Sequence, residues 1–148
     1  QRNIYIASII EFAIETGMRR SEILKLRWCD VDLQNGFASL YNTKNGEDRR
    51  VPLTRRCIEV LKTVPQTVER VFPISATCLR LAWNRARKKA GITDLRFHDL
   101  RHEAVSRFFE MGMSVPDVAL ISGHKDVRQL FRYTHLNPEN LFKKYSAF

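Results

Sequence analysis

The chain has 148 residues, of which 44% are apolar, enough for one domain with its own hydrophobic core. Its net charge of +9 and pI near 9.9 favour a polyanionic partner such as nucleic acid. No run of residues approaches the roughly 18 consecutive apolar positions of a membrane span, and no secretory signal opens the sequence. The three cysteines (Cys29, Cys57, Cys78) form no Cys-x-x-Cys pair, which argues against a zinc site or a disulfide framework.

The first half of the chain is predicted to hold two helices followed by a small sheet. Residues 3–16 place apolar side chains at helical spacing, and Gly17 is a typical helix stop. This helical pattern starts almost at the first residue and no initiator Met precedes it, so we expect a fragment of a longer protein. After a short helix over 19–28, two Asn-Gly pairs separate alternating segments and predict an antiparallel sheet. Its three strands are expected near 31–33, 37–43 and 49–53.

The second half is predicted to be helical. Ser75 and Ser114 are expected as N-caps, and Gly91, Gly112 and Gly123 as helix ends. Helices are expected over 54–64, 75–90, 97–112, 114–123, within 124–136 and over 138–145. The predicted fold is therefore mainly α with a small three-stranded antiparallel β-sheet, an α+β fold.

Several polar residues are not needed by this architecture. Arg19 and Arg20 stand at a helix start, where the helix dipole disfavours cations. Lys44 flanks the second predicted turn and is unremarkable alone. His124 follows a helix-ending glycine, and Tyr133 lies among basic residues. Histidines and arginines stabilise charge on a phosphodiester attacked by an oxygen nucleophile, which a tyrosine near cations can be, so phosphoryl transfer is the chemistry indicated.

The segment HDLRH allows an alternative interpretation, a metal site. His98, Arg101 and His102 are spaced i, i+3 and i+4 and share one helical face. The two histidines have metal-binding spacing, but the arginine between them would repel a cation, so an anion site is favoured. Tyr145 is a rival nucleophile, because it too is flanked by polar residues near the C-terminus. Tyr5 and Tyr41 are expected in the core.

Taken together, the segments TGMRRSEILKLRWCDVDL, TKNGEDRRVPL, HDLRH and ISGHKDVRQLFRYTHL resemble the catalytic domain of the tyrosine recombinases, the phage integrase family. They occur in that family's order and run over about four fifths of the chain. The resemblance implies the tyrosine recombinase catalytic-domain fold over residues 1–148, with the family's N-terminal DNA-clamping domain absent. It also implies an enzyme that needs no metal and no cofactor.

The resemblance also assigns site residues by position. The catalytic set it implies is Arg19, Lys44, His98, Arg101, His124 and Tyr133, with Glu22 in support. Tyr133 would form a 3′-phosphotyrosine, while Arg19 and Arg101 would hold the non-bridging oxygens. His98 would accept or share the tyrosine proton, and His124 would donate to the phosphate. Lys44 would protonate the leaving 5′ oxygen.

The biological setting implied by the resemblance is site-specific recombination of double-stranded DNA, for integration or excision. The expected assembly is a homotetramer on DNA and a monomer when free, in the cytoplasm, bacterial or phage-encoded and without membrane contact. Two alternatives stay open: a type IB topoisomerase that relaxes DNA, and a DNA-binding module without activity. A metal-dependent histidine enzyme is a third, which insensitivity to a chelator would dismiss.

Overall fold

The structure is a computed structural model that describes residues 4–41, 43, 46–134, 139, 143 and 146. The helices are α1 (Ile6–Thr16), α2 (Arg20–Lys25), α3 (Arg55–Thr63), α4 (Ala76–Lys89), α5 (Asp99–Glu110) and α6 (Val115–Ser122), with 3₁₀ turns η1 (Trp28–Asp30) and η2 (Val127–Tyr133). The strands are β1 (Val31–Asp32), β2 (Phe37–Leu40) and β3 (Arg49–Pro52). The predicted α+β class is confirmed. The expected helix over 138–145 lies outside the described residues except for residues 139 and 143.

The sheet is antiparallel in the order β1-β2-β3, as the two Asn-Gly turns predict. Ala38 opposes Val51, and both face the core, whereas Pro52 stands at the strand end without disturbing the ladder. The described part of β2 ends at Leu40, shorter than predicted. Tyr41 follows it and is exposed, so the prediction that Tyr41 lies in the core is wrong.

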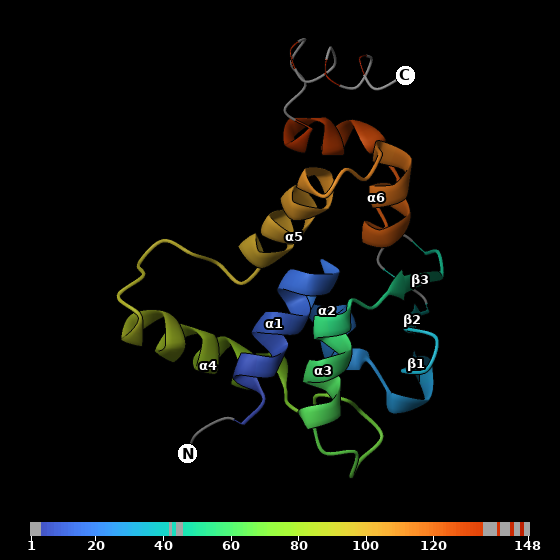
Figure 1. Cartoon of the computed structure of the whole chain (residues 1–148). Helices are drawn as coiled ribbons and strands as arrows, with labels where there is room; N and C mark the ends of the chain where they lie inside the picture. Colours follow the sequence, from blue (N-terminus) through green and yellow to red (C-terminus); the bar gives the residue numbers. More distant parts are fainter. Residues whose placement is uncertain are drawn as a thin grey trace.

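Two clusters of buried hydrophobic side chains hold the molecule together. In Figure 1, α5 and α6 lie above α1 and α3. The first gathers α1, the sheet, α3 and α4 around the fully buried Phe12 and Phe72, whose rings meet edge to face at 5.6 Å. The second gathers α5, α6 and η2 around Val118 and Leu130. Helix α5 packs across α1 and so joins the two clusters. The predicted site residues Arg19 and Arg101 lie at this contact between α1 and α5.

Gly17 turns the chain at the end of α1, next to α5. It ends α1 with φ +68°, a left-handed conformation that glycine adopts without strain. A Cβ at this position would lie 3.5 Å from Ala104 and Phe108 of α5, an ordinary van der Waals distance, so the backbone conformation and not the space favours glycine here. The chain can therefore turn at Gly17 directly against α5, which brings the start of α2 to the buried face of α5.

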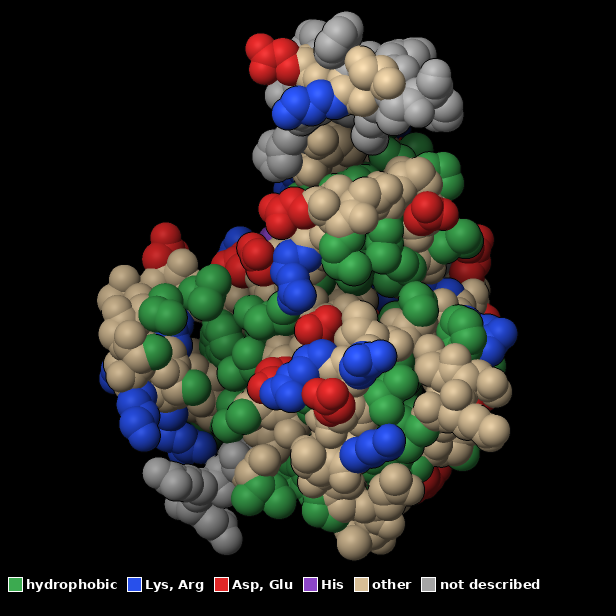
Figure 2. All heavy atoms as spheres, viewed as in Figure 1, with side chains coloured by type: hydrophobic (Ala, Val, Ile, Leu, Met, Phe, Trp, Pro, Cys, Tyr) green, Lys and Arg blue, Asp and Glu red, His purple; other side chains and the backbone are tan. Residues whose placement is uncertain are grey.

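Both signs of charge are mixed on the face shown in Figure 2, where Lys and Arg side chains lie beside Asp and Glu. Arg56 of α3, for example, pairs with Glu11 of α1 at 2.8 Å and with Glu59 at 3.3 Å. Among the described helices, none is long and apolar enough to cross a membrane.

Candidate active site

Arg101 is the most deeply buried of the predicted site residues, with 5% of its surface exposed. Its Nη1 donates to Gly17 O at 2.7 Å and its Nη2 to Ser122 O at 2.8 Å. Its guanidinium therefore joins the end of α1 to the end of α6. Burial, and then the charges of Arg19 and Arg49, lower its pKa to about 10, so it still carries its charge at neutral pH.

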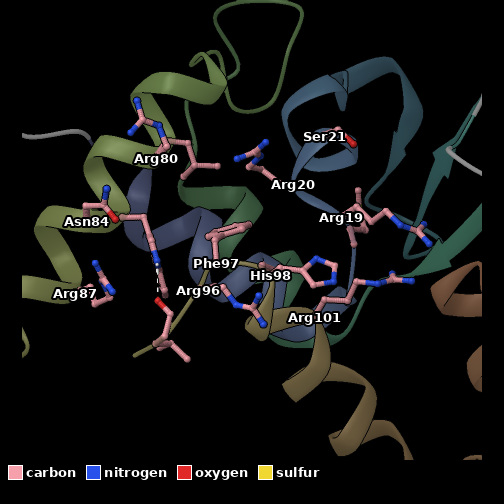
Figure 3. Close-up of a pocket in the computed structure, with 15 residues that line it drawn as sticks. Arg19, Arg20, Ser21, Arg80, Asn84, Arg87, Arg96, Phe97, His98 and Arg101 are labelled. Atoms are coloured by element: carbon pink, nitrogen blue, oxygen red, sulfur yellow. Dashed lines mark hydrogen bonds between the residues drawn. The ribbon is translucent and has the colours of Figure 1, made fainter. Parts of the chain in front are cut away.

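Arg19 lies beside Arg101 at the N-terminus of α2. Its backbone N–H donates to Glu22 Oε1 at 2.8 Å, and its own side chain is partly buried 3.7 Å from Glu22 Oε2. This carboxylate offsets the unfavourable position of a cation at a helix start. Figure 3 shows the Arg19 and Arg101 side chains extending to the same side, with the His98 ring near them. Two guanidiniums so placed can donate hydrogen bonds to one anion.

His124 follows the glycine that ends α6. Gly123 has φ +75°, and a Cβ there would lie only 2.9 Å from Nη1 of Arg49, so both backbone and packing require glycine. The His124 Nδ1 faces Ser122 Oγ at 2.6 Å and Arg101 Nη2 at 3.4 Å. Because guanidinium can only donate, this nitrogen is the acceptor, which leaves Nε2–H of His124 available as a donor.

His98 and His102 occupy the face of α5 that the spacing predicts. Their rings meet edge to face with centroids 5.0 Å apart. Among the described residues, no group of three or more His, Cys, Asp or Glu gathers that could hold a metal ion.

Tyr133 lies at the end of η2 and is 8% exposed. The segment 127–133 is a 3₁₀ helix, a tighter form of the helix predicted within 124–136. The Tyr133 Oη contacts His102 Nδ1 and accepts a hydrogen bond from Arg132 Nη2 at 2.6 Å. The predicted nucleophile is therefore held by one histidine and one arginine.

These residues line one cleft of about 430 Å³. Of the predicted catalytic set, Arg19, His98, Arg101, His124 and Tyr133 are brought together there. Lys44 and the rival Tyr145 lie outside the described residues. The cleft is further lined by His102, Val105, Arg128, Gln129 and Arg132.

A second, larger hollow of about 650 Å³ adjoins the cleft and shares Arg19, His98 and Arg101 with it (Figure 3). Its far wall is α4, which contributes Arg80, Asn84 and Arg87, while Arg20 and Arg96 complete its basic lining. Arg87 is tied to Thr93 O at 2.7 Å. The hollow extends the positive surface away from the cleft, so that an extended polyanion can follow it.

The predicted set left out Arg49, Arg132 and His102, which contact its members Glu22 or Tyr133. Arg49 looks in sequence like any strand residue, because its partners Glu22 and Ile121 are remote along the chain. Arg132 is one of 25 lysines and arginines, and nothing in the sequence distinguishes it from the others. His102 did carry a signal, its position four residues after His98, but the spacing alone does not tell which partner it meets.

The lowered pKa of His124 predicts that the stability of the fold depends on pH. Burial, then the charges of Arg101 and Arg19, lower the pKa of His124 to about 4. An unfolded histidine titrates near 6.5, so the stability from a neutral His124 is present above about pH 6.5 and is lost as the pH falls toward 4. Between pH 7.5 and 5 we expect the free energy of unfolding of the wild type to fall by on the order of 1 kcal/mol more than that of His124→Gln, a value discounted because His124 is partly exposed.

Urea unfolding at the two pH values measures this difference. Acidic side chains interfere little in this window, because the pKa values of Glu22 and Asp99 are lowered from already acidic values. Equal pH dependence of the two proteins contradicts the prediction.

The cleft brings together guanidiniums, histidines and a held tyrosine hydroxyl, which are groups that phosphodiester chemistry can use. The chain belongs to the phage integrase family, whose model matches residues 1–140. It is 46% identical to a shufflon-specific DNA recombinase of Escherichia coli over 99% of this chain and 39% of the relative. It is 34% identical to the tyrosine recombinase XerA of Saccharolobus solfataricus over 93% of this chain and 48% of that protein.

The fold agrees with this membership. The catalytic domain of bacteriophage HP1 integrase superposes with a TM-score of 0.79 and 26% identity, covering 98% of this chain and 83% of that one. The resemblance seen in the sequence and the tyrosine recombinase catalytic-domain fold are thus confirmed. The chain spans about two fifths to one half of the length of the two recombinases.

Proposed function

We propose that this chain is the catalytic domain of a site-specific DNA recombinase that cleaves and rejoins strands through a 3′-phosphotyrosine. The observation that carries the proposal is the shared cleft, in which Arg19, Arg101 and His124 face the same space as the Tyr133 hydroxyl. Membership of a family of recombinases and integrases supports it. The topoisomerase alternative and the inactive module are not favoured by these relatives.

The roles follow from donor geometry. Arg19 and Arg101 hold the two non-bridging phosphate oxygens, since each guanidinium presents several donors in one plane. His124 donates its Nε2–H to the same phosphate, because its Nδ1 already faces Arg101. These preorganised donors stabilise the charge that develops on the phosphorane in the transition state.

The chemical step joins Tyr133 Oη to phosphorus and breaks the bond to the 5′ oxygen. We propose Lys44, from the sequence alone, as the acid that protonates this leaving oxygen. The 5′-hydroxyl of a partner strand then attacks the phosphotyrosine and releases the enzyme. The bond energy is retained in the covalent intermediate, so the proposed cycle consumes no nucleotide.

Double-stranded DNA is the proposed partner, and the cytoplasm of a bacterium the proposed location. Exchange of strands between two sites needs several active sites at once, so we propose a homotetramer on DNA. The adjoining hollow with its arginines supports DNA as the ligand, because it continues the positive surface from the cleft along α4. The remainder of a longer protein is proposed to supply the clamp on the opposite face of the duplex.

Covalent trapping tests the proposal. The chain is incubated with a pool of nicked duplexes of randomised core sequence, from which a short fragment diffuses away after cleavage. We expect a protein–DNA adduct that survives a denaturing gel and that Tyr133→Phe abolishes, because the variant lacks the attacking oxygen. Sequencing the trapped DNA identifies the preferred site.

Tyr145→Phe is the matched control, since it removes the other C-terminal phenol and should leave the adduct intact. An adduct that persists in Tyr133→Phe contradicts the assignment of the nucleophile. The reaction is run with and without EDTA, and loss of the adduct in EDTA contradicts a metal-independent mechanism.

A further inference from the structure

The hydroxyl of Tyr133 contacts two side chains outside the proposed phosphate-binding set, His102 and Arg132. Tyr133 Oη contacts His102 Nδ1, and the two rings are stacked at an interplanar angle of 26° with centroids 6.0 Å apart. Arg132 Nη2 lies 2.6 Å from the same Oη and 3.0 Å from the same Nδ1. Three polar atoms thus form a closed triangle at the edge of the cleft.

Hydrogen-bonding rules fix the proton positions in this triangle. The guanidinium of Arg132 can only donate, so it donates to both Oη and Nδ1. The nitrogen Nδ1 of His102 therefore has to present its lone pair, and the proton of neutral His102 resides on Nε2. The phenol donates its single proton toward Nδ1. A basic nitrogen is consequently aimed at the one proton that must leave when the tyrosine attacks.

The surroundings keep His102 neutral. Burial is the main cause that lowers its pKa, followed by the charge of Arg132, while Asp99 acts in the opposite direction and Arg101 and Arg96 add to the lowering. The base is therefore in its unprotonated form at neutral pH. Arg132 also lies over the Tyr133 ring, with Cζ 4.7 Å from the ring centroid, so a cation stabilises negative charge on the phenol oxygen.

We propose that His102 is the general base for Tyr133, a role that rests on the proposed recombinase function. As Oη bonds to phosphorus and the bond to the 5′ oxygen breaks, the phenolic proton moves to His102 Nδ1. The leaving oxygen takes its proton from a separate acid, for which Lys44 is the candidate. In the rejoining step the phenol oxygen leaves phosphorus and recovers its proton from His102. This assignment replaces the expectation that His98 takes the tyrosine proton, because the Tyr133 hydroxyl contacts His102.

His102→Asn and His102→Ala, compared on the duplexes trapped by wild type, separate a base from a mere hydrogen-bond partner. The Asn side chain can accept a hydrogen bond from the phenol close to where Nδ1 stands, but it is not basic. We expect both variants to bind DNA with nearly unchanged affinity and to form the adduct about 100-fold or more slowly than wild type. His102→Asn at the wild-type rate overturns the proposal, because positioning alone would then suffice.

A second substrate shows whether His102 exchanges a proton with the Tyr133 oxygen or with the leaving 5′ oxygen. In a duplex with sulfur in place of the scissile 5′ oxygen, the leaving thiolate needs no acid. We expect this substrate to restore cleavage by Lys44→Ala and not by His102→Asn. Restoration of His102→Asn places the histidine on the leaving-group side and overturns the proposal.

Adduct formation by wild type and by His102→Asn distinguishes a failure of the proposed recombinase function from a failure of the role proposed for His102. A wild-type chain that forms no adduct contradicts the recombinase function itself, whereas adducts at equal rates in wild type and His102→Asn contradict only the role of His102. Nitrogen-15 NMR of labelled histidine in the DNA-free chain tests the tautomer directly. We expect Nε2–H on His102, and a protonated Nδ1 overturns the geometry on which the inference stands.

Discussion

Glu22→Ala should lower the free energy of unfolding by about 3–5 kcal/mol, because it leaves a buried guanidinium without its counter-ion. Glu22 accepts from Arg49 through both carboxylate oxygens, at 2.6 and 2.9 Å, and from the backbone of Arg19 at 2.8 Å. Burial raises the pKa of Glu22, but the hydrogen bonds and charge of Arg49 outweigh it and leave the pKa below its ordinary value. The carboxylate is therefore charged and fully engaged at neutral pH.

Loss of this carboxylate also disturbs the active site. Arg49 donates its Nε to Ile121 O at 2.9 Å and packs against Gly123, so it supports the turn that presents His124. Without the Glu22 carboxylate, the guanidinium of Arg49 is a buried charge without its counter-ion, which favours its movement toward solvent. We therefore expect adduct formation to fall together with stability.

Urea unfolding of Glu22→Ala and of a matched surface control measures the effect. The control is Glu59→Ala, which removes an ion pair of Arg56 at 3.3 Å that is more than half exposed, and we expect a change of about 0–1 kcal/mol. The double variant Glu22→Met with Arg49→Met should recover part of the lost stability but not the adduct, since the turn still lacks its support. A Glu22→Ala loss no larger than that of the control contradicts a buried pair.

The fold could be predicted largely from local patterns, since periodicity and glycine positions mark most helices and both turns. Differences arise where tertiary packing decides. The helix predicted over 97–112 ends at Glu110, and Met111, which follows it, is exposed. The first helix is described from Ile6, and His98 serves as N-cap of α5 instead of lying within it.

The site was predictable only in part. Arg19, His98, Arg101, His124 and Tyr133 were identified from their types and order, and the structure brings them to one cleft. Glu22 was named as their support, but Arg49 and His102 were not, because the contacts of these two link residues far apart in sequence. Arg49 reaches 72 positions to Ile121, and Tyr133 is 31 positions from His102. No local pattern encodes such pairs.

Arg101→Lys is expected to slow adduct formation by about 100- to 1,000-fold, the usual cost of removing a preorganised donor to a transition-state oxygen. Lysine keeps the charge but offers a single nitrogen, whereas Arg101 reaches Gly17 O and Ser122 O with two different nitrogens. One ammonium cannot satisfy both carbonyls and also face the phosphate. The position of His124 should shift as well, because the Nη2 that faces its Nδ1 is lost.

A matched substitution shows whether charge alone accounts for the site. Arg128→Lys changes another arginine of the same cleft, one that is exposed and pairs with Asp126 at 3.0 Å. We expect its adduct rate to stay within about threefold of wild type, since exposed ion pairs of this kind contribute little. DNA affinity, measured by titration with the same duplex, should change little in either variant because the net charge is kept. A normal adduct rate in Arg101→Lys means that a cation at this position is sufficient, and the fork geometry assigned to Arg101 is then wrong.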